Sequence, residues 1–302
     1  MTFRSNGKLL LTSEYLVLNG AKALALPCKL GQSLVVEGTE EPNVYWESYD
    51  VDNNCWFKAE VNVAQNQVIL TSDRSIAAGL LDVLCKATQI NPEFKPDQHI
   101  VKTYLEFDQK WGLGSSSTLR INIANWANCS PYQLHDKTSN GSGYDIAAGL
   151  SDTPILFSNS NGFSSNECEF NPVFNANLFF IHLNQKQISS SEVIAYQDTV
   201  ADLDLDYCIS VVESLTNKII ESTNLVTFEE AIQEHELVLS SILQRESVGE
   251  THFSDYNLGA VKSLGGWGGD FILATGPNVI VVKEYFNQKG YHTVLEYSEL
   301  IR

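Results

Sequence analysis

Basic side chains are scarce in this chain of 302 residues, which has 19 Lys and Arg against 37 Asp and Glu and a formal net charge of −18. Proteins that wrap nucleic acid or lie on anionic lipid need clustered Lys and Arg. The composition therefore argues against nucleic-acid and membrane partners. A phosphorylated small molecule stays compatible, because its site needs only a few basic groups and some backbone N–H donors.

Long apolar runs and paired cysteines are also missing. No run approaches the ~20 residues that a membrane span requires. Lys8 and Glu14 interrupt the N-terminal apolar segment, which argues against a signal peptide. The 6 cysteines form no CxxC pair and have no companion histidines at zinc spacing, so we expect reduced thiols in the core. The default expectation is a cytoplasmic protein.

The order of predicted elements indicates an α+β protein with a strand-rich opening. Strands are predicted over 8–11, 23–26, 32–37, 44–49, 55–63 and 99–107, with helices over 72–90 and 115–128. The second half gives strands over 178–183, 271–275, 279–282 and 291–297, and helices starting at Ser191, Asp206, Phe228 and Lys283. The length favours two domains. The polar stretch 158–171 marks the junction, giving domains 1–165 and 166–302.

A glycine- and serine-rich loop lies between the strand over 99–107 and the helix that follows. It reads Trp111-Gly112-Leu113-Gly114-Ser115-Ser116-Ser117. Glycines let the backbone approach a ligand, N–H groups at a helix start favour anions, and serine hydroxyls reach phosphate oxygens or Mg²⁺. An ordinary Gly/Ser turn explains the heptapeptide equally well. It is not a Walker loop, because no Gly-Lys-Ser/Thr follows.

A second turn places a carboxylate after two glycines, in the sequence Gly141-Ser142-Gly143-Tyr144-Asp145-Ile146. A tight turn of this kind can present Asp145 into a cleft, where it could serve as a base. The alternative is that Asp145 only caps the helix that follows.

Two further segments carry charge in unusual surroundings. Lys8 begins an apolar strand and Glu14 lies within the next apolar stretch, so each charge is expected to meet a partner or a cleft. Near the C-terminus four glycines precede a buried-type strand, which indicates close backbone approach or an anion site. This run reads Gly265-Gly266-Trp267-Gly268-Gly269-Asp270.

Together the four segments resemble, in order and approximate spacing, the signature motifs of the GHMP kinases, over residues 7 to 275. The opening Gly-Lys and Glu-Tyr pattern is similar to mevalonate and phosphomevalonate kinases. Three features look more like phosphomevalonate kinases. They are the Asp145-Ile146 pair, the Gly268-Gly269-Asp270 sequence, and the stretch 185–191 with Lys186, Ser189 and Ser190.

The resemblance implies a GHMP-kinase fold, with an N-terminal α/β domain containing a left-handed βαβ unit and a C-terminal ferredoxin-like α+β domain. ATP and Mg²⁺ would be the cofactors, with ATP and acceptor meeting between the domains. Asp145 would be the base and Lys8 its electrostatic partner. The triphosphate would lie against residues 112–117, with Ser116 on Mg²⁺. Glu14, Lys186, Ser189, Ser190 and residues 265–270 would line the acceptor or phosphate side.

The sequence also departs from the family pattern. Many mevalonate kinases have a Mg²⁺-binding Glu before the base, where this chain has Leu134 with Asp136 close by. Trp111 and Trp267 stand where small residues are usual. A sugar or homoserine kinase, a diphosphomevalonate decarboxylase-like enzyme and a catalytically inactive relative therefore remain alternatives. The expected partner is a small-molecule acceptor with a hydroxyl or phosphate, bound by a monomer or homodimer.

Overall fold

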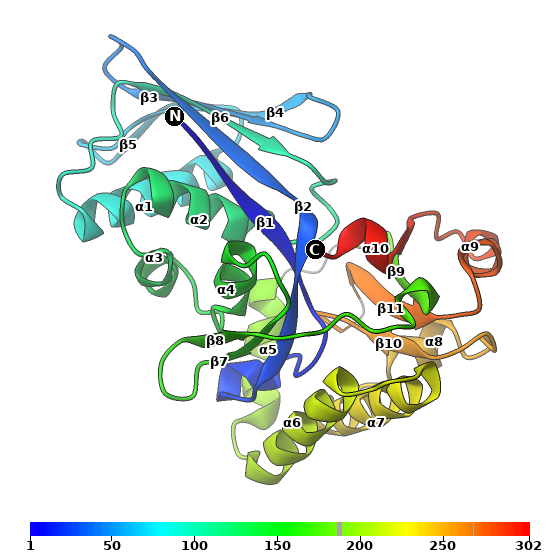
Figure 1. Ribbon diagram of the computed structural model, residues 1–302. Coiled ribbons are helices and arrows are strands. Elements are labelled where there is room, and N and C mark those ends of the chain that lie inside the picture. The colour runs from blue at the N-terminus through cyan, green and yellow to red at the C-terminus, as the bar shows by residue number, and fades with distance from the viewer. Residues whose placement is uncertain (186–188, 268) are drawn as a thin grey trace. The chain divides into compact units, whose positions relative to one another are not determined.

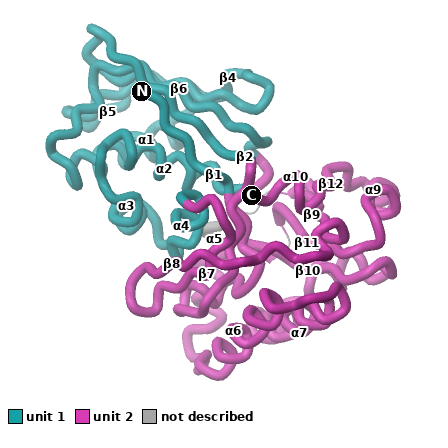
Figure 2. Tube along the Cα trace, in the orientation of Figure 1, with its two compact units in different colours: residues 1–7, 30–109, 113–150 teal, residues 8–29, 110–112, 151–302 magenta. Residues whose placement is uncertain are grey.

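The contacts between residues divide the chain into two compact units that do not follow chain order. The structure is a computed structural model and describes residues 1–185, 189–267 and 269–302 (Figure 1). Unit 1 holds residues 1–7, 30–109 and 113–150, and unit 2 holds 8–29, 110–112 and 151–302 (Figure 2). The expected junction at 158–171 lies wholly within unit 2, and the first strands contribute to both units.

Unit 1 is a sheet with helices on one face (Figure 1). The strands, in sheet order, are β5 (Gln67–Thr71), β4 (Cys55–Asn62), β3 (Val44–Tyr49), β6 (His99–Leu105) and the second half of β2 (Ala23–Gly38). β3 and β6 are parallel and the other neighbours antiparallel. β1 (Thr2–Leu10) also pairs with β2.

Four helices supply the rest of the unit 1 core. They are α1 (Arg74–Ile90), α2 (Ser115–Trp126), α3 (Pro131–Thr138) and α4 (Tyr144–Leu150). Alternate side chains of the strands point to the helices, so Val44 and Trp46 of β3 are buried with Leu80 and Leu84 of α1. Asp73 caps α1 by accepting hydrogen bonds from the backbone N–H groups of Ser75 and Ile76.

Unit 2 contains a four-stranded antiparallel sheet in the order β10-β11-β9-β12. The strands are β9 (Leu178–His182), β10 (Val261–Ser263), β11 (Phe271–Thr275) and β12 (Val294–Glu296). The helices are α5 (Ser189–Val200), α6 (Asp206–Ile220), α7 (Leu225–Leu243), α8 (Val248–His252), α9 (Val279–Gln288) and α10 (Tyr297–Leu300). The chain order strand, helices, two strands, helix, strand is that of a ferredoxin-like unit, which confirms the expected C-terminal architecture.

A hairpin completes unit 2. β7 (Ile155–Ser158) pairs with the first half of β2 and with β8 (Ser164–Glu167). The polar stretch that the sequence marked as a junction is therefore partly strand. Strands predicted separately over 23–26 and 32–37 are one continuous strand, β2.

The strand predicted over 279–282 is wrong, because these residues form the first turn of α9. Asn278 starts the helix by accepting hydrogen bonds from the backbone N–H groups of Ile280 and Val281, at 3.0 and 3.1 Å. Val282 and Phe286, four residues apart on one helix face, are then both buried in the unit 2 core. The cap and this packing outweigh the strand preference of β-branched residues.

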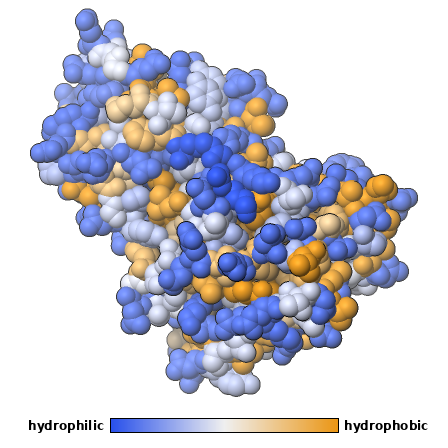
Figure 3. Space-filling view, in the orientation of Figure 1, coloured by the Kyte–Doolittle hydropathy of each residue, from blue (hydrophilic) through white to orange (hydrophobic). Residues whose placement is uncertain are grey.

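The surface and the cysteines agree with most of the compositional expectations. The face shown in Figure 3 is mainly hydrophilic, with apolar residues in scattered groups. All 6 cysteines are free thiols, but only Cys28 is buried and the rest are half-buried. Among the described residues, none of the helices has the length and apolarity needed to cross a membrane.

The cap at Asn278 gives a stability prediction. We expect Asn278→Ala to lower the free energy of unfolding by about 1 kcal/mol, because two first-turn N–H groups lose their acceptor. Urea unfolding measures this change. Gln288→Ala, an exposed position at the other end of α9, serves as the control and should change stability by less than about 0.5 kcal/mol. Equal stabilities for both variants would contradict the role of the cap.

Candidate functional site

The glycine-rich loop ends in a helix start that offers backbone donors. Gly112 and Gly114 have left-handed φ values of 64° and 91°. Gly114 is the N-cap of α2 and supplies no side-chain acceptor to the first turn, so N–H groups there stay available to an anion. Ser116 is exposed, whereas Ser117 is buried and donates its hydroxyl to the Gly114 carbonyl at 2.9 Å. Of these two serines, Ser116 is the one presented to a ligand.

Asp145 lies in unit 1 near the start of α4, just after Gly143 with its φ of 89°. Its Oδ1 accepts a hydrogen bond from the backbone N–H of Ile146 at 3.0 Å, and the residue is half-buried. α4 packs tightly on α2, because a Cβ added at Gly149 would lie 2.5 Å from the Ile121 side chain. This close packing fixes the Asp145 backbone relative to the helix that carries the serines.

In unit 2, Gly112 is contacted on two sides by charged residues. Lys8 donates a hydrogen bond from Nζ to the Gly112 carbonyl at 3.0 Å. A Cβ added at Gly112 would lie 2.1 Å from Cγ and Oδ2 of Asp270. This approach and the φ of 64° favour glycine, because a side chain at position 112 would strain the backbone and require Asp270 to move. The fold thus brings Lys8 of the first motif and Asp270 of the last to the first glycine of the central motif.

Aromatic contacts hold the same segment in place. The ring of Trp111 packs edge-to-face on Phe271 with centroids 5.8 Å apart. His182 lies with Nε2 at 3.2 Å from the Lys110 carbonyl. Trp111 therefore anchors the loop to β9 and β11, a role that could not be read from the sequence.

A network of charged groups is buried inside unit 2. The side chains of Glu14 and Lys262 are both 0% exposed, and Lys262 Nζ lies 2.6 Å from Glu14 Oε1. Lys262 Nζ is also 3.6 Å from Glu236 Oε1, while Ser263 donates its hydroxyl to Glu236 Oε2 at 2.9 Å. Sequence reasoning placed Glu14 on the acceptor or phosphate side and gave Lys262 no role. In the structure Glu14 has an internal partner, which places it in a structural network.

His235 completes this network as a neutral acceptor. Its Nε2 accepts the backbone N–H of Ser13 at 2.9 Å. Burial and the nearby Lys262 charge hold the pKa of His235 well below its ordinary value, so the ring stays neutral. Ser13 and Tyr15 have left-handed φ values of 62° and 63°. Because such backbone is costly for non-glycine residues, the hydrogen bond and the ion pair keep this segment in its conformation.

The structure describes only part of the last glycine run, residues 265–270, and of the stretch 185–191. Gly268 and Lys186 lie outside the described residues, as do the side chains of Ser189 and Ser190. Trp267 is 5% exposed, and its indole N–H donates to the Glu246 carbonyl at 3.2 Å. It packs in the core of unit 2. These residues keep their predicted roles only as hypotheses.

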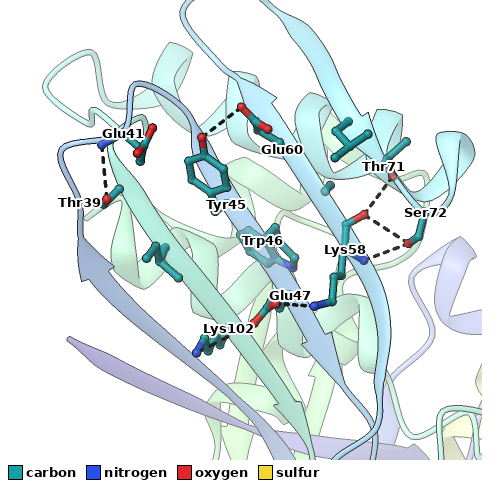
Figure 4. A pocket seen from close by; sticks show the side chains of 13 residues that line it. Thr39, Glu41, Tyr45, Trp46, Glu47, Lys58, Glu60, Thr71, Ser72 and Lys102 are labelled. Atoms are coloured by element: carbon teal, nitrogen blue, oxygen red, sulfur yellow. Dashed lines mark hydrogen bonds and ion pairs between the residues drawn. The ribbon is translucent and has the colours of Figure 1, made fainter.

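A groove of about 800 Å³ lies on the outer face of the unit 1 sheet and contains none of the predicted site residues (Figure 4). Both of its lysines pair with one glutamate: Glu47 lies 2.8 Å from Lys58 and 4.0 Å from Lys102. Tyr45 donates to Glu60 at 3.2 Å. The groove also contains Glu41 and Glu60, so carboxylates outnumber lysines and the lining does not suit phosphate.

No group of three or more His, Cys, Asp or Glu side chains in the described part of the chain could hold a metal ion. Leu134, the position at which the motif resemblance implies a Mg²⁺-binding glutamate, is completely buried in the unit 1 core. Mg²⁺ bound with nucleotides often takes only one or two protein ligands beside phosphates and water. The exposed hydroxyl of Ser116 at the start of α2 could supply one such ligand.

Comparison with known proteins supports the fold. No protein-family model and no curated protein matches the sequence. Among solved structures, Methanococcus jannaschii mevalonate kinase is 14% identical, with 98% of this chain and 96% of that chain covered and a TM-score of 0.70. Streptococcus pneumoniae phosphomevalonate kinase, in complex with phosphomevalonate and AMPPNP, is 14% identical, with 98% and 99% covered and a TM-score of 0.70.

A sugar kinase is similar as well. Lactococcus lactis galactokinase complexed with galactose is 13% identical, with 98% of this chain and 92% of that chain covered and a TM-score of 0.66. The chain thus has the GHMP-kinase fold, as its motifs imply.

The buried network gives a prediction about pH. Burial raises the pKa of Glu14 from 4.5 to about 7, an effect that the attraction of Lys262 only partly offsets. Between pH 4.5 and about 7, Glu14 keeps a proton in the folded protein that it has lost in the unfolded chain. Proton binding by Glu14 therefore stabilises the folded state fully below pH 4.5, and this contribution to stability disappears as the pH rises to about 7. Glutamine does not titrate. We expect Glu14→Gln to gain stability relative to wild type across this window.

Urea unfolding of both proteins at several pH values measures the difference. Glu284→Gln, an exposed position on α9, is the matched control and should follow wild type. If Glu14→Gln instead loses stability relative to wild type as the pH rises, the Lys262 attraction outweighs burial.

Proposed function

We propose that this chain is an ATP-dependent small-molecule kinase of the GHMP type, acting on a phosphomevalonate- or mevalonate-like acceptor. The observation that carries the proposal is the uncapped start of α2, with Lys8 bonded to Gly112 of the same loop. Such a start suits a triphosphate. The solved complex of the phosphomevalonate kinase with AMPPNP and phosphomevalonate supports ATP as donor.

Each residue has a defined task in this proposal. An oxygen of the acceptor's hydroxyl or phosphate attacks the γ-phosphorus while the bond from that phosphorus to ADP breaks, and Asp145 accepts or orients the acceptor proton. Lys8 stabilises the negative charge that develops on the transferred group. Backbone N–H groups of residues 112–117 hold the triphosphate, and Ser116 would contact Mg²⁺, which neutralises phosphate charge. Positioning and electrostatics supply most of the rate in phosphoryl transfer.

The alternative functions have less support from the structure and the comparisons. The similarity to galactokinase keeps a sugar acceptor open, because the fold hosts both kinds of kinase. A homoserine kinase has no supporting observation in the structure. The presence of both Lys8 and Asp145 argues against a decarboxylase-like or inactive relative. A coupled ADP-release assay with mevalonate, phosphomevalonate, homoserine and sugars tests the whole assignment, and no turnover with any of them would contradict it.

The loop geometry gives a prediction for nucleotide binding. We expect Gly114→Val to abolish binding of Mg-ATP while the protein stays folded, because a β-branched residue strains a backbone with φ of 91° and alters the start of α2. Calorimetric titration with Mg-AMPPNP measures binding. The matched control is Gly38→Val in the same unit, where an added Cβ meets nothing within 4 Å. Unchanged affinity in Gly114→Val would move the nucleotide site elsewhere.

The catalytic pair gives a second prediction. Asp145→Asn and Lys8→Met should each lower kcat about 100-fold or more, with a much smaller effect on nucleotide affinity. The double variant should be little worse than the poorer single variant, as expected for groups that act together. Asp136→Asn, an exposed carboxylate on α3, is the control. Near-normal turnover by Asp145→Asn would reduce Asp145 to a helix cap.

A further inference from the structure

Arg120 is a basic residue in the proposed site region to which no task has been assigned. It lies on α2, four residues after Ser116, so the two side chains share one face of the helix. Four residues correspond to about 6 Å along the helix axis. Arg120 therefore lies about one turn beyond the helix start that would hold the triphosphate.

The guanidinium group of Arg120 uses few of its donors. Nη2 donates to the Thr138 carbonyl at a long 3.4 Å. Nε is buried and has no hydrogen-bond partner within the residues that the structure describes. A guanidinium has five N–H donors, and a buried donor without a partner is costly. A bound group that accepts these hydrogen bonds would remove that cost.

The Asp145 carboxylate affects the pKa of Arg120 but forms no ion pair with it in the part of the chain that the structure describes. Burial lowers the pKa of Arg120, and the Asp145 carboxylate partly offsets this effect. No ion pair within 4.0 Å joins the two side chains in the described ranges. Arg120 is thus close enough to Asp145 for an electrostatic effect, yet its donors stay available to a third group.

The geometry of a guanidinium matches carboxylate and phosphate groups, which it can bind through two parallel hydrogen bonds.

We propose that Arg120 binds the anionic group of the acceptor, a carboxylate or a phosphate, and thereby sets acceptor specificity. The inference rests on the proposed kinase function. The acceptor side is favoured over the nucleotide because Arg120 is hydrogen-bonded to Thr138, the last residue of α3, from which the chain runs directly into the turn that carries Asp145.

Steady-state kinetics of wild type, Arg120→Gln and Arg120→Lys with Mg-ATP test this role. The acceptors are galactose, which is uncharged, mevalonate, which has a carboxylate, and phosphomevalonate, which has both anionic groups. We expect turnover only of an anionic acceptor, and Arg120→Gln should raise its KM about 10- to 100-fold. The kcat and the KM for ATP should stay within about 3-fold of wild type. Arg120→Lys should restore part of the loss, because it keeps the charge without the planar geometry.

Two comparisons sharpen the result. Arg74→Gln, an exposed arginine at the start of α1, should behave as wild type. An effect on phosphomevalonate alone would assign the phosphate to Arg120, and an equal effect on mevalonate would assign the carboxylate. A lower kcat with unchanged acceptor KM, or unchanged kinetics throughout, would overturn the inference while leaving the kinase assignment intact.

If wild type turns over none of the three acceptors, the proposed function fails for them, and direct binding decides the role of Arg120. Calorimetric titration with phosphomevalonate should then give an affinity at least 10-fold weaker for Arg120→Gln than for wild type. Equal affinities, or no binding by wild type, would overturn the inference.

Discussion

The ion pair between Glu14 and Lys262 connects two distant parts of the chain inside unit 2. Removing both charges from water is costly, and the cost is offset only where the groups are close and hydrogen-bonded. Here Lys262 lies 2.6 Å from Glu14 and 3.6 Å from Glu236, whose carboxylate also accepts the Ser263 hydroxyl, and this offsets the cost only in part, because the pKa of Glu14 is still raised. The pair fixes the segment after β1 against β10. Lys8 lies on β1, and the run that ends in Asp270 follows β10.

A steric limit at Gly112 follows from the same arrangement. Asp270 occupies the space that a side chain at position 112 would need, and Lys8 bonds the carbonyl of that residue. Residues 110–112 therefore belong to unit 2, whereas the chain from Leu113 onward belongs to unit 1 and starts α2. The glycine-rich motif thus begins with residues that are held by contacts within unit 2, and it continues along the chain into a helix of unit 1.

The proposed anionic ligands would bind to a chain with a net charge of −18, so the placement of individual cations matters. Lys8 donates a hydrogen bond to the Gly112 carbonyl. Arg120 lies about one turn along α2 and donates a long hydrogen bond to the Thr138 carbonyl, which leaves other N–H donors of its guanidinium group for a ligand. By contrast, Lys262 is buried and lies next to the carboxylates of Glu14 and Glu236, so it is not available to bind a ligand. Position and available donors decide which cations can act, because long-range charge is screened by salt within about 10 Å.

The sequence by itself determined the order of most elements, the four motifs and, through their resemblance, the GHMP-kinase fold. These features are local, since periodicity, capping residues and glycine spacing are set by near neighbours in the chain. It misread residues 279–282, where the cap at Asn278 outweighs a run of β-branched residues. Only the tertiary structure decided that Glu14 faces Lys262, that Trp111 packs on Phe271, and that Arg120 lies within electrostatic range of Asp145. Such pairs join residues far apart in the chain, and their partners are selected by packing that no local pattern records.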